Sequence, residues 1–196
     1  MTTRIVIMTV LLVGFLSSSA NAAWPIYHEP EFNGQILDID TKEPIEGAVV
    51  VVEYKKESMG MGAGHESSVI KVRETLTDKD GKFHIPSYTT TLLLPFTWQD
   101  HSIFIIYKPG YASIQLALND YFTGKDMSEQ VGSWPDQDLR MLKYRLRCPG
   151  IVELPKLQTR EQRLRARRIY IVDYNSKELP LLYKSLGEEG KALGVE

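Results

Sequence analysis

The tetrapeptide DKDG, within residues 75–85 (TLTDKDGKFHI), carries two aspartates at the spacing that calcium-binding loops use. An EF-hand loop also needs oxygen ligands at later positions and a bidentate glutamate at its end. If Asp78 takes the first position, Lys82 falls at the fifth and Thr89 at the twelfth, so these side chains are wrong for calcium. The same residues suit the tip of a β-hairpin, in which Gly81 adopts positive φ and the aspartates bond to the local backbone. We therefore predict a hairpin here.

Other patterns for catalysis or metal binding do not occur in the sequence. The histidines are scattered, and no two of them have the close spacing of a metal-binding pair. No G-x-S-x-G motif marks a nucleophilic serine. We therefore predict no catalytic residue, no metal ligand and no cofactor. The histidines in question are His28, His65, His84 and His101.

The segment TTTLLLPFTWQDH, residues 89–101, is the most unusual part of the chain, because large apolar side chains crowd a region between predicted strands. Pro95 argues against an ordinary central strand here, since proline cannot donate to the ladder. We favour a loop folded over an open end of the fold. The alternative is an exposed contact for a partner, with Trp98 as its anchor. On that alternative the candidate contact residues are Leu93, Phe96 and Trp98.

The N-terminal 22 residues have the pattern of a secretory signal peptide: Arg4, an apolar run that ends at Leu16, and the sequence ANA as a cleavage site. The run is too short for a transmembrane helix, which needs about 20 apolar residues. We predict cleavage after Ala22, a mature chain without a transmembrane segment, and a periplasmic or secreted location. Removal of Arg4 changes the formal net charge from −2 to −3, which argues against nucleic acid as a partner. The lone Cys148 cannot form a disulfide within the chain.

Five arginines fall within residues 160–168. Around a helix they spread over several faces, so we favour a solvated helix face. The alternative is a contact for acidic protein surfaces or anionic lipid head groups. On that alternative Arg163 and Arg167 are the candidate partner-binding residues.

Short alternating or apolar runs, separated by turn residues, fill residues 32–154 and predict β-strands. The run at residues 48–54 is mostly valine and should be buried on both faces. Residues 58–68, SMGMGAGHESS, lack periodicity and predict a flexible loop. The fold class we predict is mainly β, an antiparallel seven-stranded β-sandwich. The expected strands are residues 34–39, 48–54, 69–77, 82–85, 102–107, 112–118 and 150–154.

Composition changes at Pro155, and the remaining residues predict helices. Thr159 and Gln162 have the spacing of a capping box, which stabilises a helix start by about 1 kcal/mol. A second start at residues 175–176 keeps Pro180 within the first turn, where it loses no helical hydrogen bond. We therefore predict that residues 155–196 form two short helices packed on the sandwich.

Three segments together resemble the carboxypeptidase regulatory-like domain, a transthyretin-like (prealbumin-like) β-sandwich. They are GQILDIDTKEPIEGAVVVVEY at residues 34–54, TLTDKDGKFHI at residues 75–85 and IIYKPGY at residues 105–111. The resemblance covers most of residues 32–154. The turn residues that shape it are Pro44 and Gly47 in a first hairpin, Asp78 and Gly81 in a second, and Pro109 and Gly110 in a third turn.

The resemblance implies a non-catalytic module, because such domains accompany peptidases, outer-membrane receptors or surface proteins without performing chemistry themselves. Enzymes with related folds are disfavoured: the chain lacks the terminal Tyr-Arg-Gly-Ser signature of hydroxyisourate hydrolases, and its histidines are not paired as in intradiol dioxygenases. We expect an exported accessory protein that binds a protein or an envelope component through loops and the tail. A small-ligand or carbohydrate-binding module is the alternative, with Trp98 and Trp134 as stacking residues. Oligomeric state is left open by the sequence.

Overall fold

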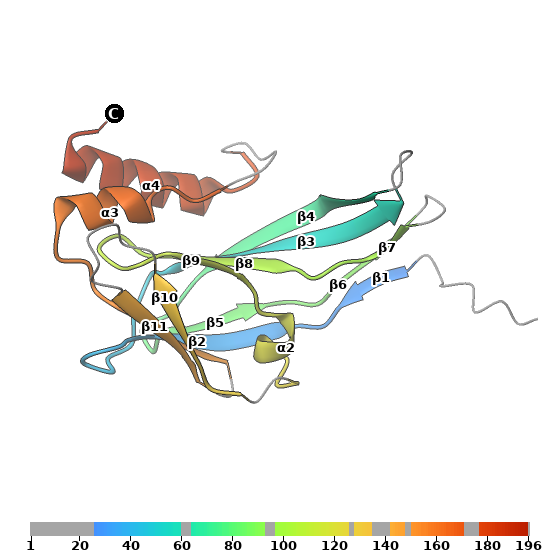
Figure 1. The fold of residues 1–196 in the computed structure, drawn as a ribbon, viewed down its shortest axis with the longest axis horizontal. Helices are drawn as coiled ribbons and strands as arrows, with labels where there is room; N and C mark the ends of the chain where they lie inside the picture. The colour runs from blue at the N-terminus through green and yellow to red at the C-terminus, as the bar shows by residue number, and fades with distance from the viewer. Residues whose placement is uncertain are drawn as a thin grey trace, which may run out of the picture.

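The computed structural model describes most of the chain after the predicted signal peptide. It describes residues 26–59, 64–92, 97–125, 128–134, 142–147, 150–170 and 177–195. The fold is mainly β, with twelve strands and three helices among these residues. Figure 1 shows the strands in layers, with helices α3 and α4 together above one layer.

Two five-stranded sheets form the body of the molecule, and we call them the β2 sheet and the β3 sheet. The β2 sheet has the order β10 (Gln130–Trp134), β11 (Leu142–Arg147), β12 (Ile151–Leu154), β2 (Phe32–Asp38) and β5 (Lys82–Ile85). The β3 sheet has a path of four strands, β4 (His65–Leu76), β3 (Val49–Met59), β8 (Ile103–Tyr107) and β9 (Ile114–Ala117), and β7 (Thr97–Gln99) also pairs with β3. A separate pair joins β1 (Ile26–Glu29) to β6 (Tyr88–Thr91).

The main core lies between the two sheets, because each contributes alternate side chains to one buried cluster. β3 is buried on both faces, as its valine run predicts: Val50 and Val52 face this core, while Val49 and Val51 face a second cluster that includes α4. The principal members of the first cluster are Phe32, Ile36, Val50, Val52, Phe83, Phe104, Ile106, Val152 and Leu154.

The expected strand count and strand direction need correction. The described residues contain twelve strands rather than seven, because β1, β6, β7, β10 and β11 lie in segments that we had not assigned to strands. The sheets are also not purely antiparallel, since β12 pairs with β2 in parallel, with Val152 opposite Ile36. A parallel neighbour requires a long connection, and β2 and β12 stand at opposite ends of the sandwich sequence.

The turn at residues 78–81 does not close a hairpin, contrary to our prediction. β4 before it pairs with β3, whereas β5 after it pairs with β2, so the chain crosses from one sheet to the other. The local chemistry is as expected: Asp78 Oδ1 accepts from the Asp80 and Lys82 amides, and Gly81 has φ of 70°. The turn rests on β2, because the Ile36 amide donates to the Gly81 carbonyl at 2.8 Å.

The connection that contains Pro44 and Gly47 likewise joins β2 to β3 in the other sheet, so it is not the predicted hairpin. It too rests on β2, since the Ile45 amide donates to the Ile36 carbonyl at 3.0 Å. The turn at Pro109 and Gly110 is different. It joins β8 to β9, which are antiparallel neighbours, and Gly110 has φ of 82°.

Residues 58–68, which we expected to be a flexible loop, are mostly strand. β3 continues to Met59 and β4 begins at His65, with these two residues paired in register. The register shifts at Tyr54 and Lys55, where a β-bulge interrupts the ladder. Backbone pairing therefore extends beyond the periodic apolar pattern. Residues 60–63 lie outside the described residues.

The tail contains helix α3 (Arg160–Ala166) and helix α4 (Pro180–Leu193). Thr159 and Gln162 form the predicted capping box of α3. α4 begins at Pro180, and its first amides are capped from β4: Glu74 accepts from the amides of Leu181 and Leu182 at 2.7 and 3.0 Å. The predicted start at residues 175–176 lies outside the described residues. Within the described chain, no helix combines the length and apolar character that a membrane span requires.

Candidate functional site

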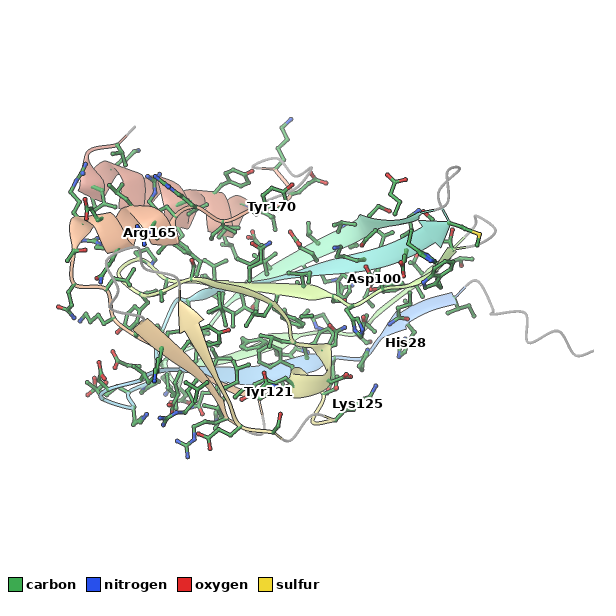
Figure 2. All side chains as sticks on the ribbon, viewed as in Figure 1. His28, Asp100, Tyr121, Lys125, Arg165 and Tyr170 are labelled. Carbon is green, nitrogen blue, oxygen red and sulfur yellow. The ribbon has the colours of Figure 1, made fainter. Side chains whose placement is uncertain are left out.

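A polar cleft of about 460 Å³ lies where the end of β1, the strand β3, the β7–β8 connection and the short helix α2 (Asn119–Phe122) meet. Asp100 lines it from the β7–β8 side and Lys125 from the segment after α2 (Figure 2). We call it the acidic cleft. Its lining residues are Glu29, Pro30, Glu57, Gln99, Asp100, His101, Asn119, Asp120, Thr123 and Lys125.

Glu29 is the central residue of the acidic cleft. Its side chain lines the cleft although the residue is only 3% exposed. Its Oε1 accepts from Asn119 Nδ2 at 2.8 Å, Ser102 Oγ at 2.9 Å and the Tyr27 hydroxyl at 3.3 Å. All three donors are neutral, and within the described chain no hydrogen bond reaches Oε2. A buried carboxylate is costly unless it is paired, so this group has spare capacity for a positive partner.

Strand alternation places Glu29 in this position. Residues of β1 alternate between exposed and buried, so Tyr27 and Glu29 share the inner face. The Tyr27 ring packs edge-on against Tyr54, with 6.3 Å between ring centroids, and also contacts Tyr88. Burial raises the pKa of the Tyr27 hydroxyl, although the bond with Ser102 opposes this. The phenol therefore stays protonated and donates toward Glu29.

Asn119, the first residue of α2, forms the other wall beside Glu29. Its Nδ2 donates to Glu29 Oε1, while its Oδ1 is buried and accepts no hydrogen bond from the described residues. The carboxylate fixes the orientation of the amide, because the opposite orientation would set two acceptor oxygens against each other. An unpaired buried acceptor is costly. Asn119 Oδ1 is thus a second group in this cleft with an unused acceptor.

The remaining acids of the cleft are held by neighbouring donors. Glu57 accepts from Trp98 Nε1 at 2.8 Å and lies 3.4 Å from His65 Nδ1. Burial opposes ionisation of Asp100, but hydrogen bonds from the Ser67 hydroxyl and the His101 amide hold the pKa of its carboxyl below the ordinary value.

The cleft has an excess of negative charge. Four carboxyl groups line it (Glu29, Glu57, Asp100 and Asp120), and Lys125, 4.0 Å from Asp120, is the lining cation, so the formal charge is −3 with His101 neutral. A concave site lined by one sign of charge attracts ions of the other sign. Among the described residues, no group of three or more His, Cys, Asp or Glu side chains is arranged to hold a metal ion.

Of the predicted contact residues in the apolar segment, the structure describes Trp98. It belongs to β7, is half-buried, and lies beside the acidic cleft through its hydrogen bond to Glu57. Its ring packs edge-on against His65, with 5.3 Å between centroids. Leu93 and Phe96 lie outside the described residues. Trp134 belongs to β10, and its side chain is not among those described.

Arg163 and Arg167 join the two tail helices to each other. Arg163 makes a bidentate pair with Glu189, with distances of 2.7 and 2.8 Å. Arg167 Nε donates to the Leu186 carbonyl at 3.1 Å. The side chain of Arg163 is 34% exposed, so a partner can reach it only in part. These contacts give both arginines a structural role whether or not a partner also binds them.

Sequence reasoning did not identify Glu29, Asn119 or Asp100 as site residues. Asn119 follows the strand predicted at residues 112–118, in a segment to which we had assigned no element, and Glu29 precedes the first predicted strand. The usable signal was the alternation in IYHE, residues 26–29, which places a glutamate on the same face as a tyrosine. That pattern groups Glu29 with Tyr27, although it neither states which face is buried nor identifies the donors.

A larger groove of about 840 Å³ lies elsewhere on the surface, lined by residues of β2, β5 and the segment after α2. Its polar feature is the hydrogen bond between His84 Nδ1 and Asn33 Oδ1 at 2.8 Å. Phe83 and Phe122 contribute apolar surface. The polar pair is mutually satisfied and exposed, so we consider the acidic cleft the better candidate site.

Comparison with known proteins adds one weak similarity. No protein-family model matches the chain, and no curated protein matches it significantly. A solved structure, that of a 9R-lipoxygenase from Cyanothece PCC8801, is similar with a TM-score of 0.24 and 12% identity, over 66% of this chain and 16% of the lipoxygenase. A similarity this low carries no argument about fold or activity.

Proposed function

We propose that this chain is an exported, non-catalytic binding protein whose acidic cleft holds a positively charged group of its partner. The scaffold we propose is a transthyretin-like β-sandwich of the carboxypeptidase regulatory-like kind, supported by the sequence resemblance and by two sheets that share one core. The partner class is a protein or another envelope component. The signal-peptide pattern of residues 1–22 supports a periplasmic or secreted location.

The observation that carries this proposal is the uncompensated Glu29. Two other buried glutamates have cationic partners within the chain: Glu153 is paired with Lys42 and Arg147, and Glu189 with Arg163. A third, Glu53, has no such pair, but it does not line the cleft, and burial raises the pKa of its carboxyl. Glu29, equally buried, is bonded by neutral groups. Buried charges are normally paired. A ligand cation would give Glu29 the positive partner that Lys42 and Arg147 give Glu153, and that Arg163 gives Glu189.

Titration calorimetry with a tetralysine peptide and the mature chain, residues 23–196, tests this function. We expect binding that weakens as salt is raised, since salt screens exposed charges. Glu29→Gln keeps the side-chain shape and removes the charge, so it should weaken binding about tenfold, or about 1.4 kcal/mol. Glu46→Gln, a change of equal charge at an exposed position outside the cleft, is the matched control. No binding, or equal losses in the two variants, would overturn the proposal.

Carbohydrate binding is the second candidate, because Trp98 lies beside a cleft that also contains the amide groups of Gln99 and Asn119. Aromatic rings and planar polar side chains are the groups that sugars contact. Neutral oligosaccharides that bind without salt dependence, and lose affinity in Trp98→Ala, would favour this candidate over the first.

A further inference from the structure

We infer that the acidic cleft recognises a primary ammonium group, held by Glu29 Oε2 and Asn119 Oδ1. The inference rests on the proposed function and specifies the chemistry of the cation. Its basis is a pair of acceptors that receive no hydrogen bond from the described residues, Glu29 Oε2 and the buried Asn119 Oδ1, on two side chains already joined by a hydrogen bond of 2.8 Å.

The first step concerns the acceptors that are available. A carboxylate offers about four lone-pair sites, and Glu29 Oε1 already receives three donors. Only Oε2 is unoccupied among the described contacts. Asn119 adds the buried Oδ1, which has no partner. The cleft therefore offers single acceptor atoms on two adjacent groups rather than two oxygens of one carboxylate.

The second step compares the cations that proteins commonly recognise. A guanidinium is a planar fork that prefers both oxygens of one carboxylate, and Glu29 cannot offer both because Oε1 is taken. A quaternary ammonium has no N–H donor and is held by aromatic faces. A primary ammonium is compact and carries three donors that can reach separate acceptors. It is the cation whose donors match this arrangement.

The third step concerns room for the rest of the ligand. A second hollow of about 190 Å³ adjoins the cleft and shares His101, Asn119 and Asp120 with it. Its other lining residues include Leu118 and Leu146, which are apolar. An alkyl stem can lie there while its ammonium group meets Glu29 and Asn119. The ligand class is thus an alkylammonium, such as a lysyl side chain or another aliphatic amine.

Three peptides that differ in one side chain test the inference on the unaltered mature chain. The side chain is lysine in the first, Nε-trimethyl-lysine in the second and arginine in the third. We expect the lysine peptide to bind at least about tenfold more tightly than either of the others, since charge-assisted hydrogen bonds are the strong ones. Equal affinities would overturn the ammonium inference while the proposed function stands. Failure of all three to bind would overturn both.

A variant pair locates the recognition within the cleft. Asn119→Ala removes the unused acceptor and should lower the affinity for the lysine peptide about tenfold. Asn33→Ala, on the exposed face of β2, is the matched control and should leave the affinity unchanged. Thermal unfolding shows whether each variant is folded. If Asn119→Ala is folded and keeps its full preference for lysine over trimethyl-lysine, the assignment of Asn119 is wrong.

Discussion

At the scale of residues, two buried carboxylates of this protein, Glu153 and Glu29, are stabilised in different ways. Glu153 is fully buried on the outer face of the β2 sheet, beneath Lys42 at 2.9 Å and Arg147 at 3.1 Å. Glu29 has instead the three neutral donors of the acidic cleft. The first arrangement is complete within the chain and serves stability. The second leaves charge and acceptors available, which is why we assign function to it.

Glu153 gives a prediction about pH. Burial opposes its ionisation, but Lys42 and Arg147 hold the pKa of its carboxyl below the ordinary value of 4.5. A group with a lowered folded-state pKa adds stability above its unfolded pKa, and this contribution disappears as the pH falls through the folded value. Glu153→Gln should therefore lower the free energy of unfolding by about 2 kcal/mol at pH 7. The gap between variant and wild type should shrink below pH 4.5.

Urea unfolding of both proteins at neutral and acidic pH measures this gap. Glu46→Gln again serves as the control, because its exposed side chain should change the stability little at either pH. A gap that stays constant as the pH falls would show that the charge of Glu153 is not what stabilises the fold.

The hydrogen bonds and backbone conformations of the turn residues could be predicted from the sequence, because they depend on neighbouring residues. Asp78 bonds to amides two and four residues away, and Gly81 takes the positive φ that glycine permits. The contacts of Glu29 could not be predicted in this way. Its donors Ser102 and Asn119 are 73 and 90 residues distant, so no local pattern brings them together. The candidate site therefore emerged only from the fold.

At the scale of elements, alternation predicted most strands but not which sheet they join. Apolar periodicity states which side chains face inward. It does not state which strand lies alongside, and the β4–β5 turn has the same local chemistry whether it closes a hairpin or crosses between sheets. In this protein the chain crosses between sheets, and Gly81 lies against Ile36 at the crossing: a Cβ there would lie 2.5 Å from the Ile36 carbonyl oxygen.

In helix α4, substitution of glycine by alanine should raise the stability of the protein at one position and lower it at another. Gly187 has open space around an added Cβ, so Gly187→Ala should stabilise the protein by about 1 kcal/mol through helix propensity. At Gly190 the same Cβ would lie 2.6 Å from Arg167 Nη2 and 3.1 Å from the Val195 carbonyl oxygen. Gly190→Ala should therefore destabilise by about 1 kcal/mol through overpacking and displacement of Arg167.

Each variant is the control for the other, because both make the same change in one helix. Denaturant midpoints at constant slope report the two shifts. Stabilisation by both substitutions would show that α3 does not pack against α4 as described, since Arg167 belongs to the segment that ends α3.

At the scale of the whole molecule, the acidic cleft and the tail are separate features. Figure 1 shows α3 and α4 at the opposite end of the molecule from β1, whose last residue is Glu29. The tail covers the outer face of the β3 sheet through Leu179 and Leu182, which pack in a cluster with Val49 and Val51. This separation implies that the tail stabilises the sheet without shaping the cleft.

The substitution Leu182→Ala tests whether the tail and the acidic cleft are independent. Leu182 is fully buried against the sheet, so the substitution should lower the free energy of unfolding by about 2–5 kcal/mol. The affinity of the folded fraction for the tetralysine peptide should remain that of the wild type, because Leu182 does not line the cleft. Lys184→Ala, at an exposed position of the same helix, should change neither quantity. If Leu182→Ala loses affinity at a temperature where it is fully folded, the tail is part of the binding surface. In that case Arg163 and Arg167 would again be candidate partner-binding residues.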